Sequence, residues 1–377
     1  MLFTLKGVFM KLIHCADLHL DSSMTSNLSR EKARERKSEL LLTFNRMIQY
    51  AKNEGVMAIL IAGDLFDKKK VSKTALNTVW QAINENPQID FYYLQGNHGV
   101  GGLLDSVESL PANLKLFNDT WTNYVIEDES GRTVTINGIE LNESNSLQAY
   151  DSLVLDVDNF NIVMLHGQEA GHVSRDKAEI INIRGLRNRG IDYLALGHVH
   201  SYKEEALDSR GVYCYSGCLE GRGFDECGEH GFVLLDIDAK THSFSRTFVP
   251  IARRNIYTLD IDVTGCNTTM EAVERIEKVL AQGTYPENSM MKFVLTGEVS
   301  IESEIDIAYL IKQFENRCYF LKIYDETKLC VNYDAFALDI SLKGEFVRMV
   351  MNDSELGEDE KADIIRCGIQ ILTGEED

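Results

Sequence analysis

Five short runs of apolar residues, each followed closely by polar groups, constrain the fold of this chain more than any other feature. The runs are Leu12–Cys15, Ala58–Ala62, Phe91–Leu94, Ile162–Leu165 and Tyr193–Leu196. They are short, β-branched or aromatic, and apolar at consecutive positions, as expected of strands buried on both faces. Helical patterns lie between them, for example Leu40, Phe44 and Met47 at four- and three-residue spacing. The pattern predicts an α/β sandwich of two sheets covered by helices.

The polar groups that follow these runs belong to a few residue types. They are Asp17 and His19, Asp64 and Asp67, Asn97 and His98, His166, and His198 and His200, most with a glycine beside them. In open α/β sheets the ligand site lies beyond the carboxyl ends of the strands, so we expect these side chains to share one rim. Carboxylate, imidazole and amide groups suit manganese, iron or zinc, and one carboxylate such as Asp64 can bridge two ions. Each motif alone occurs more often in a turn without a metal than in a metal site. Five such motifs in this order predict a two-metal site.

The pattern changes after Arg253 and Arg254. From residue 256 to 324 it reads strand, helix, strand, helix, strand, and a Thr268-x-x-Glu271 capping box opens the first helix. Two amphipathic helices, at 342–350 and 358–372, follow. We therefore predict an α/β core at 10–252, a small α+β domain at 253–340 and a C-terminal helical segment at 341–377.

The net charge of −21 bears on the choice of partner. It argues against a chain that coats nucleic acid or an anionic membrane by bulk attraction, but it leaves open a site whose positive charge comes from bound metal. The apolar runs are well short of the ~20 residues that a membrane helix needs. Eight cysteines without disulfide-like spacing predict free thiols in a reducing compartment. We expect a cytoplasmic protein with no membrane partner, and Met10 is a candidate start.

The motifs D-x-H, G-D-x-x-D, G-N-H, H-G and G-H-x-H, in this order, resemble those of the calcineurin-like binuclear metallophosphoesterases over about residues 11–250. The resemblance implies two divalent ions, manganese in the first place, with iron or zinc as alternatives. It assigns one ion to Asp17, His19, Asp64 and His200, and the other to Asp64, Asn97, His166 and His198. His98 would stand near the scissile phosphate as an acid or as a stabiliser of the transition state.

Three segments, HCADLHLDS, AGDLFDKK and YCYSGCLEGRGFDECGEHGF, look like those of the SbcD-type DNA repair exonucleases, close to the YhaO-like branch. That resemblance implies a DNA exonuclease or endonuclease in double-strand-break repair. The C-terminal helices would dock on an SMC-type ATPase like SbcC, and a homodimer is also typical of the family. Basic residues that could guide DNA are Arg30, Lys32, Arg34, Arg36, Lys37, Lys68–Lys70, Arg184, Arg187 and Arg189, with a solvated surface as the alternative.

One position departs from the family pattern. An acidic residue usually follows G-N-H and orients its histidine, but Gly99 stands there in this chain. This motivates one alternative, a weakly active adaptor of the ATPase. The other alternative is a phosphodiesterase or phosphatase for small nucleotides. Lys68–Lys70 follow Asp67, where Ser/Thr phosphatases of this superfamily have Arg-Gly, and this counts against the second alternative.

Overall fold

The computed structural model describes residues 9–24, 28–67, 71–96, 103, 109–128, 131, 133–169, 180–300, 303–330 and 339–373. The chain forms two compact units, Met1–Asn255 and Ile256–Asp377. The three-part division drawn from the sequence stays a prediction. All eight cysteines are free thiols, as their spacing predicted. Over the ranges that the structure describes, no helix has the length and apolar character needed to cross a membrane.

The first unit is built on two six-stranded sheets whose central strands run parallel. One sheet contains, in spatial order, β14 (Ser243–Pro250), β13 (Gly231–Asp238), β1 (Met10–Cys15), β2 (Ala58–Ala62), β3 (Asp90–Leu94) and β4 (Leu114–Leu116). The other contains β11 (Lys203–Ala206), β12 (Val212–Tyr215), β10 (Tyr193–Gly197), β7 (Phe160–His166), β6 (Thr133–Gly138) and β5 (Thr122–Glu127). The predicted two-sheet α/β fold is therefore confirmed, and each apolar run lies in a parallel central strand.

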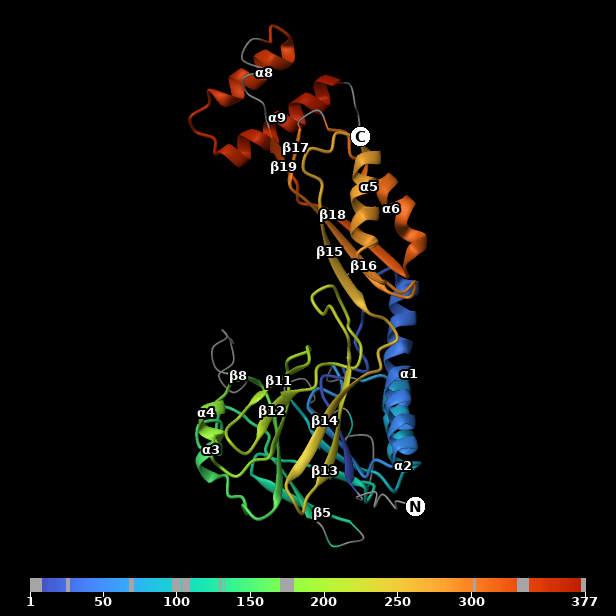
Figure 1. Ribbon diagram of the computed structural model, residues 1–377, viewed down its shortest axis with the longest axis vertical. Coiled ribbons are helices and arrows are strands. Elements are labelled where there is room, and N and C mark those ends of the chain that lie inside the picture. The colour runs from blue at the N-terminus through green and yellow to red at the C-terminus, as the bar shows by residue number, and fades with distance from the viewer. Residues whose placement is uncertain are drawn as a thin grey trace, which may run out of the picture. The chain divides into compact units, whose positions relative to one another are not determined.

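The strands are apolar at consecutive positions because each sheet is covered on both faces. In β1, Leu12 belongs to the core between the sheets, whereas Ile13 belongs to the core under the helices. Figure 1 shows α1 (Arg30–Glu54) and α2 (Lys73–Asn84) on one side of the sandwich and α3 (Ala149–Ser152) and α4 (Ile183–Leu186) on the other. A short pair, β8 (Gln168–Glu169) and β9 (Ile180–Ile181), follows β7. Helices thus enclose two facing sheets.

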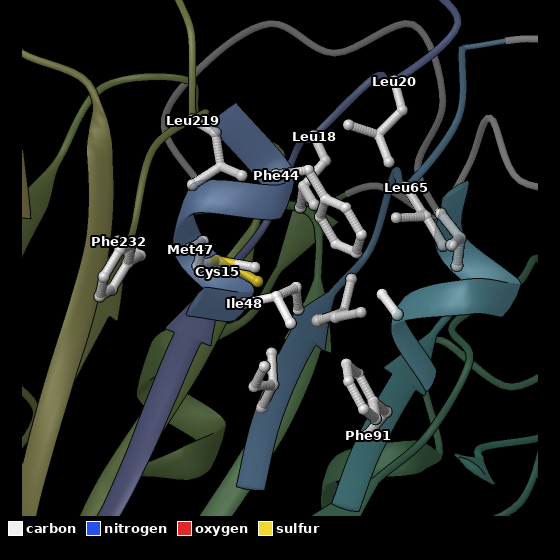
Figure 2. Close-up of a cluster of buried hydrophobic side chains, with 14 of the residues drawn as sticks. Cys15, Leu18, Leu20, Phe44, Met47, Ile48, Leu65, Phe91, Leu219 and Phe232 are labelled. Atoms are coloured by element: carbon white, nitrogen blue, oxygen red, sulfur yellow. The ribbon is translucent and has the colours of Figure 1, made fainter. Parts of the chain in front are cut away.

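Helix α1 is the main cover of the first sheet. It begins after Ser29, whose side chain accepts a hydrogen bond from the Lys32 amide, and it ends at Gly55 with φ 66°. Its buried stripe includes Phe44, Met47 and Ile48. Figure 2 shows these side chains among residues of the sheet such as Cys15 and Phe91, so one stripe of the helix faces a continuous apolar surface.

The second unit begins with three parallel strands, β15 (Ile256–Asp262), β16 (Met290–Thr296) and β18 (Phe320–Asp325). Helix α5 (Thr269–Leu280) connects the first two, and α6 (Ile307–Phe314) with the 3-10 turn Glu315–Arg317 lies between the last two. The predicted capping box of Thr268 and Glu271 forms at the start of α5. Both helices pack in one core with the sheet, through Ile276 and Phe314. The order of elements is the one predicted, and the strands pair in parallel because helical crossovers join them.

The remaining elements of this unit are β17 (Glu298–Ser300), β19 (Lys328–Cys330), α8 (Leu342–Met351) and α9 (Glu358–Thr373). Strands β17 and β19 form a parallel pair. The two helices share a small core of Val347, Val350, Ile365 and Ile369. Their bounds agree within one residue with the amphipathic segments predicted at 342–350 and 358–372.

Two leucines of α1 offer a matched test of how this helix packs. Leu40 is 2% exposed and Leu42 is 52% exposed. We expect Leu40→Ala to lower the free energy of unfolding by about 2–5 kcal/mol, because the change leaves a cavity in the core. Leu42→Ala should lower it by less than about 0.5 kcal/mol. Urea titrations of the full chain measure both, and equal losses would contradict the packing described for α1.

Candidate metal centre

The chain turns sharply where the parallel strands end, and it does so at the predicted ligands. Four residues have positive φ there: Asp17 (52°), His19 (44°), Asp64 (51°) and His198 (100°). They are four of the seven described non-glycine residues with positive φ, a conformation that costs about 1–3 kcal/mol each. Hydrogen bonds from the Asp17 amide to the Gly63 carbonyl and from the Asp64 amide to the Gln95 carbonyl, both 3.1 Å, tie these turns together. The surrounding structure therefore holds the ligand-bearing turns in a strained shape.

The turns bring five predicted ligands into two overlapping groups. Asp17, His19 and His200 form one, and Asp17, Asp64 and His166 form the other; the donor atoms within each group lie within 4.8 Å of one another. The Nε2 atoms of His19 and His200 are 3.4 Å apart. Oδ2 of Asp64 lies 3.5 Å from Nε2 of His166 and 3.9 Å from Nε2 of His19. Asp64 of the second group thus lies 3.9 Å from Nε2 of His19 in the first, and Asp17 belongs to both groups.

In His19, His166 and His200, the second ring nitrogen lies close to an oxygen atom that can accept a hydrogen bond. Nδ1 of His166 donates to the Ala62 carbonyl at 2.9 Å, and Nδ1 of His200 donates to Oε1 of Glu226 at 2.6 Å. Nδ1 of His19 lies 3.2 Å from Oδ1 of Asp67. Because a carbonyl or carboxylate oxygen only accepts, Nδ1 of His166 and Nδ1 of His200 keep their protons in these contacts, and the lone pair of the neutral ring lies on Nε2. Nε2 of His19 and Nε2 of His200 lie 3.4 Å apart, close enough for one metal ion to take the place of a proton between them, so this donor set fits a metal ion.

The charge of the site also favours cations. Asp17 and Asp64 are 1% and 2% exposed, and buried carboxylates need compensating charge. Asp17 accepts the His198 amide proton at 2.9 Å. Carboxylate and imidazole donors together are those of a hard-to-borderline divalent ion.

Two glycines make the close approach possible. A Cβ atom at Gly63, where φ is 102°, would lie 2.0 Å from Nδ1 of His166. A Cβ at Gly197 would lie 1.9 Å from the Ala62 carbonyl oxygen, the acceptor of that same ring. Side chains at either position would break the bond that orients His166.

The structure describes only some of the remaining predicted site residues. The ring of His198 contacts the ring of His166 edge-on, with centroids 5.5 Å apart. Asn97 and His98 lie outside the described residues, as do Gly99 and Lys68–Lys70. The assignment of individual ligands to two ions therefore stays a prediction.

The prediction that Arg36 could guide DNA is wrong. Arg36 was expected on a basic helix face, but its side chain is fully buried. Its guanidinium donates to Glu39 at 2.6 Å, to Glu220 at 3.2 Å and to the Gly221 carbonyl at 2.7 Å. Arg36 therefore connects α1 to the loop before β13 and is unavailable to DNA.

Three side chains that contact the candidate site had no assigned role in the sequence interpretation. Asp67 and Glu226 face His19 and His200, and Glu140 accepts hydrogen bonds from the amides of Gln95 and Gly96, directly before Asn97. Burial raises the pKa of Glu140 to about 7, against the lowering effect of these bonds. Asp67 belongs to the G-D-x-x-D motif, which was a usable signal. Glu226 and Glu140 are distant in sequence from what they hold, so no spacing rule marks them.

Comparison with known proteins places these observations in a family. The family model described as calcineurin-like phosphoesterase matches residues 10–202, which include every predicted ligand. The uncharacterized metallophosphoesterase YhaO of Bacillus subtilis (strain 168) is 30% identical over 237 residues, which are 60% of this chain and 57% of the relative. The chain thus matches less than two thirds of YhaO's length.

Two further relatives carry names that state an activity. The DNA double-strand break repair protein Mre11 of Sulfolobus acidocaldarius is 24% identical over 310 residues, covering 78% of this chain and 77% of the relative. The SbcD component of the nuclease SbcCD of Staphylococcus saprophyticus is 25% identical over 278 residues, covering 64% of this chain and 69% of the relative. At these identities, the activities belong to those relatives.

Metal binding should depend on pH through His166. Burial opposes a charged ring, but Asp64 and Asp17 outweigh burial and raise the pKa of His166 to about 9. Below that pH the metal-free ring is protonated, so a metal ion must displace a proton, and affinity should rise about tenfold per pH unit up to pH 9. Calorimetry with Mn²⁺ at pH 6.5 and 8.0, in buffers of different ionisation enthalpy, measures affinity and proton release. A pH-independent affinity would contradict this charge state.

Proposed function

The chain belongs to the calcineurin-like phosphoesterase family, and from that premise we propose that it is a manganese-dependent nuclease that cleaves phosphodiester bonds in DNA. Membership of the family makes it a hydrolase that uses metal ions. The proposal adds the metal, the substrate and a role in double-strand-break repair. The Mre11 and SbcD relatives support this choice.

The observation that carries the proposal is that five predicted ligands, from strand ends in two different sheets, lie close together. Three of their imidazole rings have Nδ1 against an acceptor and Nε2 turned to the shared space. Such an arrangement does not stabilise the fold, because it gathers strained turns and buried carboxylates in one place. It is suited to holding two divalent ions at fixed positions.

We assign the residue roles as follows. Asp17, His19, Asp64 and His200 would hold one ion, and Asp64, Asn97, His166 and His198 the other. When bound, the ions supply an acidified water nucleophile and neutralise charge on the phosphate oxygens. His98 would donate a proton or hydrogen bond to the leaving oxygen. The Ala62 carbonyl and Glu226 keep His166 and His200 in one orientation throughout.

A partner ATPase of the SbcC type is part of the proposal. Helices α8 and α9 expose the apolar side chains of Leu342, Met349 and Ile371, which are 67%, 67% and 70% exposed. An apolar helical surface of this kind suits a groove on another protein. The chain's net charge of −21 adds a reason for a partner to contribute DNA affinity. We place this assembly in the cytoplasm, where free thiols are stable.

The proposal is tested by a nuclease assay on linear DNA with Mn²⁺, beside nucleotide phosphodiesters as competing substrates. The wild-type chain should cleave DNA, and Asp64→Ala should lose both ions and all activity because Asp64 stands between the two ligand groups. Atomic emission of the purified chains counts the metal. Activity on nucleotides alone would favour a small-substrate phosphodiesterase, and full activity of Asp64→Ala would refute the site.

His98 provides a second, separate test. We expect His98→Ala to keep both ions but to lower kcat about 10²–10⁴-fold, because it removes a proton donor and no ligand. The measurement is kcat for DNA cleavage, with metal content measured on the same preparation. Loss of metal in this variant would contradict the role assigned to His98.

A further inference from the structure

Arg222 lies between the two carboxylates that face His19 and His200. Its Nη2 donates to Oε1 of Glu226 at 3.0 Å, and its Nη1 lies 3.5 Å from Oδ1 of Asp67. The same oxygen atoms are those that face the histidines: Glu226 Oε1 is 2.6 Å from Nδ1 of His200, and Asp67 Oδ1 is 3.2 Å from Nδ1 of His19. One guanidinium thus contacts the carboxylates that face both rings, and its Nη2 also lies 3.1 Å from Nδ1 of His200 itself.

The backbone of Arg222 is itself held in place. Its amide donates to Oε2 of Glu226 at 2.7 Å. The preceding residue, Gly221, accepts a hydrogen bond from buried Arg36 at 2.7 Å. Glu220 accepts from Thr43 at 2.7 Å and from Arg36 at 3.2 Å. Helix α1 therefore anchors the loop that presents Arg222, and the guanidinium has little freedom to move.

We propose that Arg222 is a positioning residue for the metal ion bound by Asp17, His19 and His200. This inference rests on the proposed function, because it requires that the site bind metal. Arg222 fixes Asp67 and Glu226, and these fix the rings of His19 and His200 so that both Nε2 atoms point at one ion. His166 and Asp64 form an ion pair with each other. Within the described part of the chain, the ion pairs of Arg222 are with Asp67 and Glu226 and not with this pair.

An arginine suits this position for geometric reasons. The planar guanidinium presents several N–H donors in a fixed fork and can serve two carboxylates at once, whereas a lysine is a single flexible charge. Without the Arg222 guanidinium, the carboxylates of Asp67 and Glu226 would be two like charges near one another with no shared counter-ion. Each would lose the guanidinium contact that helps to hold it against its histidine. Loss of such outer supports typically weakens metal affinity about 10–100-fold.

The test compares Arg222→Gln and Arg222→Lys with the wild-type full chain, and Arg210→Gln is the control. Arg210 is a matched arginine because it pairs with buried Asp192 at 2.8 Å and is 29% exposed, against 21% for Arg222, but it lies outside the site. Calorimetric titration with Mn²⁺ should resolve two binding steps in the wild-type chain. We expect Arg222→Gln to weaken one step about 10–100-fold and the other less than threefold. Arg222→Lys should give an intermediate loss, and Arg210→Gln should match the wild type.

The possible results distinguish failure of the proposed function from failure of the inference about Arg222. If the wild-type chain binds no Mn²⁺, the proposed function and this inference both fail. If it binds two ions and Arg222→Gln keeps both affinities, only the inference fails; a higher KM for DNA in that variant would then mark Arg222 as a substrate contact. Equal weakening of both steps would also overturn the selective role. If Arg222→Gln does not fold, Arg222→Lys decides: wild-type affinity in that variant would refute the inference.

Discussion

The candidate site depends on fixing one nitrogen of each histidine ring. Nδ1 of His166 is held by the Ala62 carbonyl, and Nδ1 of His200 is held by Glu226. With Nδ1 held in this way, the fold and not the metal sets the direction in which Nε2 of each of these two rings points. Nε2 of His19 and Nε2 of His200 already lie 3.4 Å apart, a distance at which one metal ion could bind both. The turns at the strand ends, the glycines that allow close approach and the buried carboxylates all help to hold the rings in this orientation.

The two sheets contribute to the site in different ways. The first sheet provides Asp17, His19 and Asp64 on turns with positive φ, and the second provides His166, His198 and His200. The sheets meet directly where Nδ1 of His166, in β7, donates to Ala62, in β2. The loop before β13 then adds Glu226 under His200, and helix α1 anchors that loop through Arg36. The strain of the turns is tolerated because so many contacts restrain them.

Much of this could be predicted from residues alone, for physical reasons. Fully apolar runs mark doubly covered strands, so β2 was predicted to the residue, and strand-end glycines marked the rim. The edge strands β5 and β11 were not predicted, because their exposed faces leave no continuous apolar run. Arg36 was misassigned because an arginine that pairs with buried acids has the same sequence pattern as an exposed one. Glu226 and Arg222 act across long sequence separations, which only the folded chain brings together.

We propose that two ions share this rim, with Asp64 between them. A crystal of the full chain grown with Mn²⁺, with anomalous data collected at the manganese edge, tests it most directly. We expect two anomalous peaks about 3.5–4 Å apart, one against Nε2 of His19 and His200 and the other against Nε2 of His166. A single peak, or peaks that do not contact these nitrogen atoms, would contradict it.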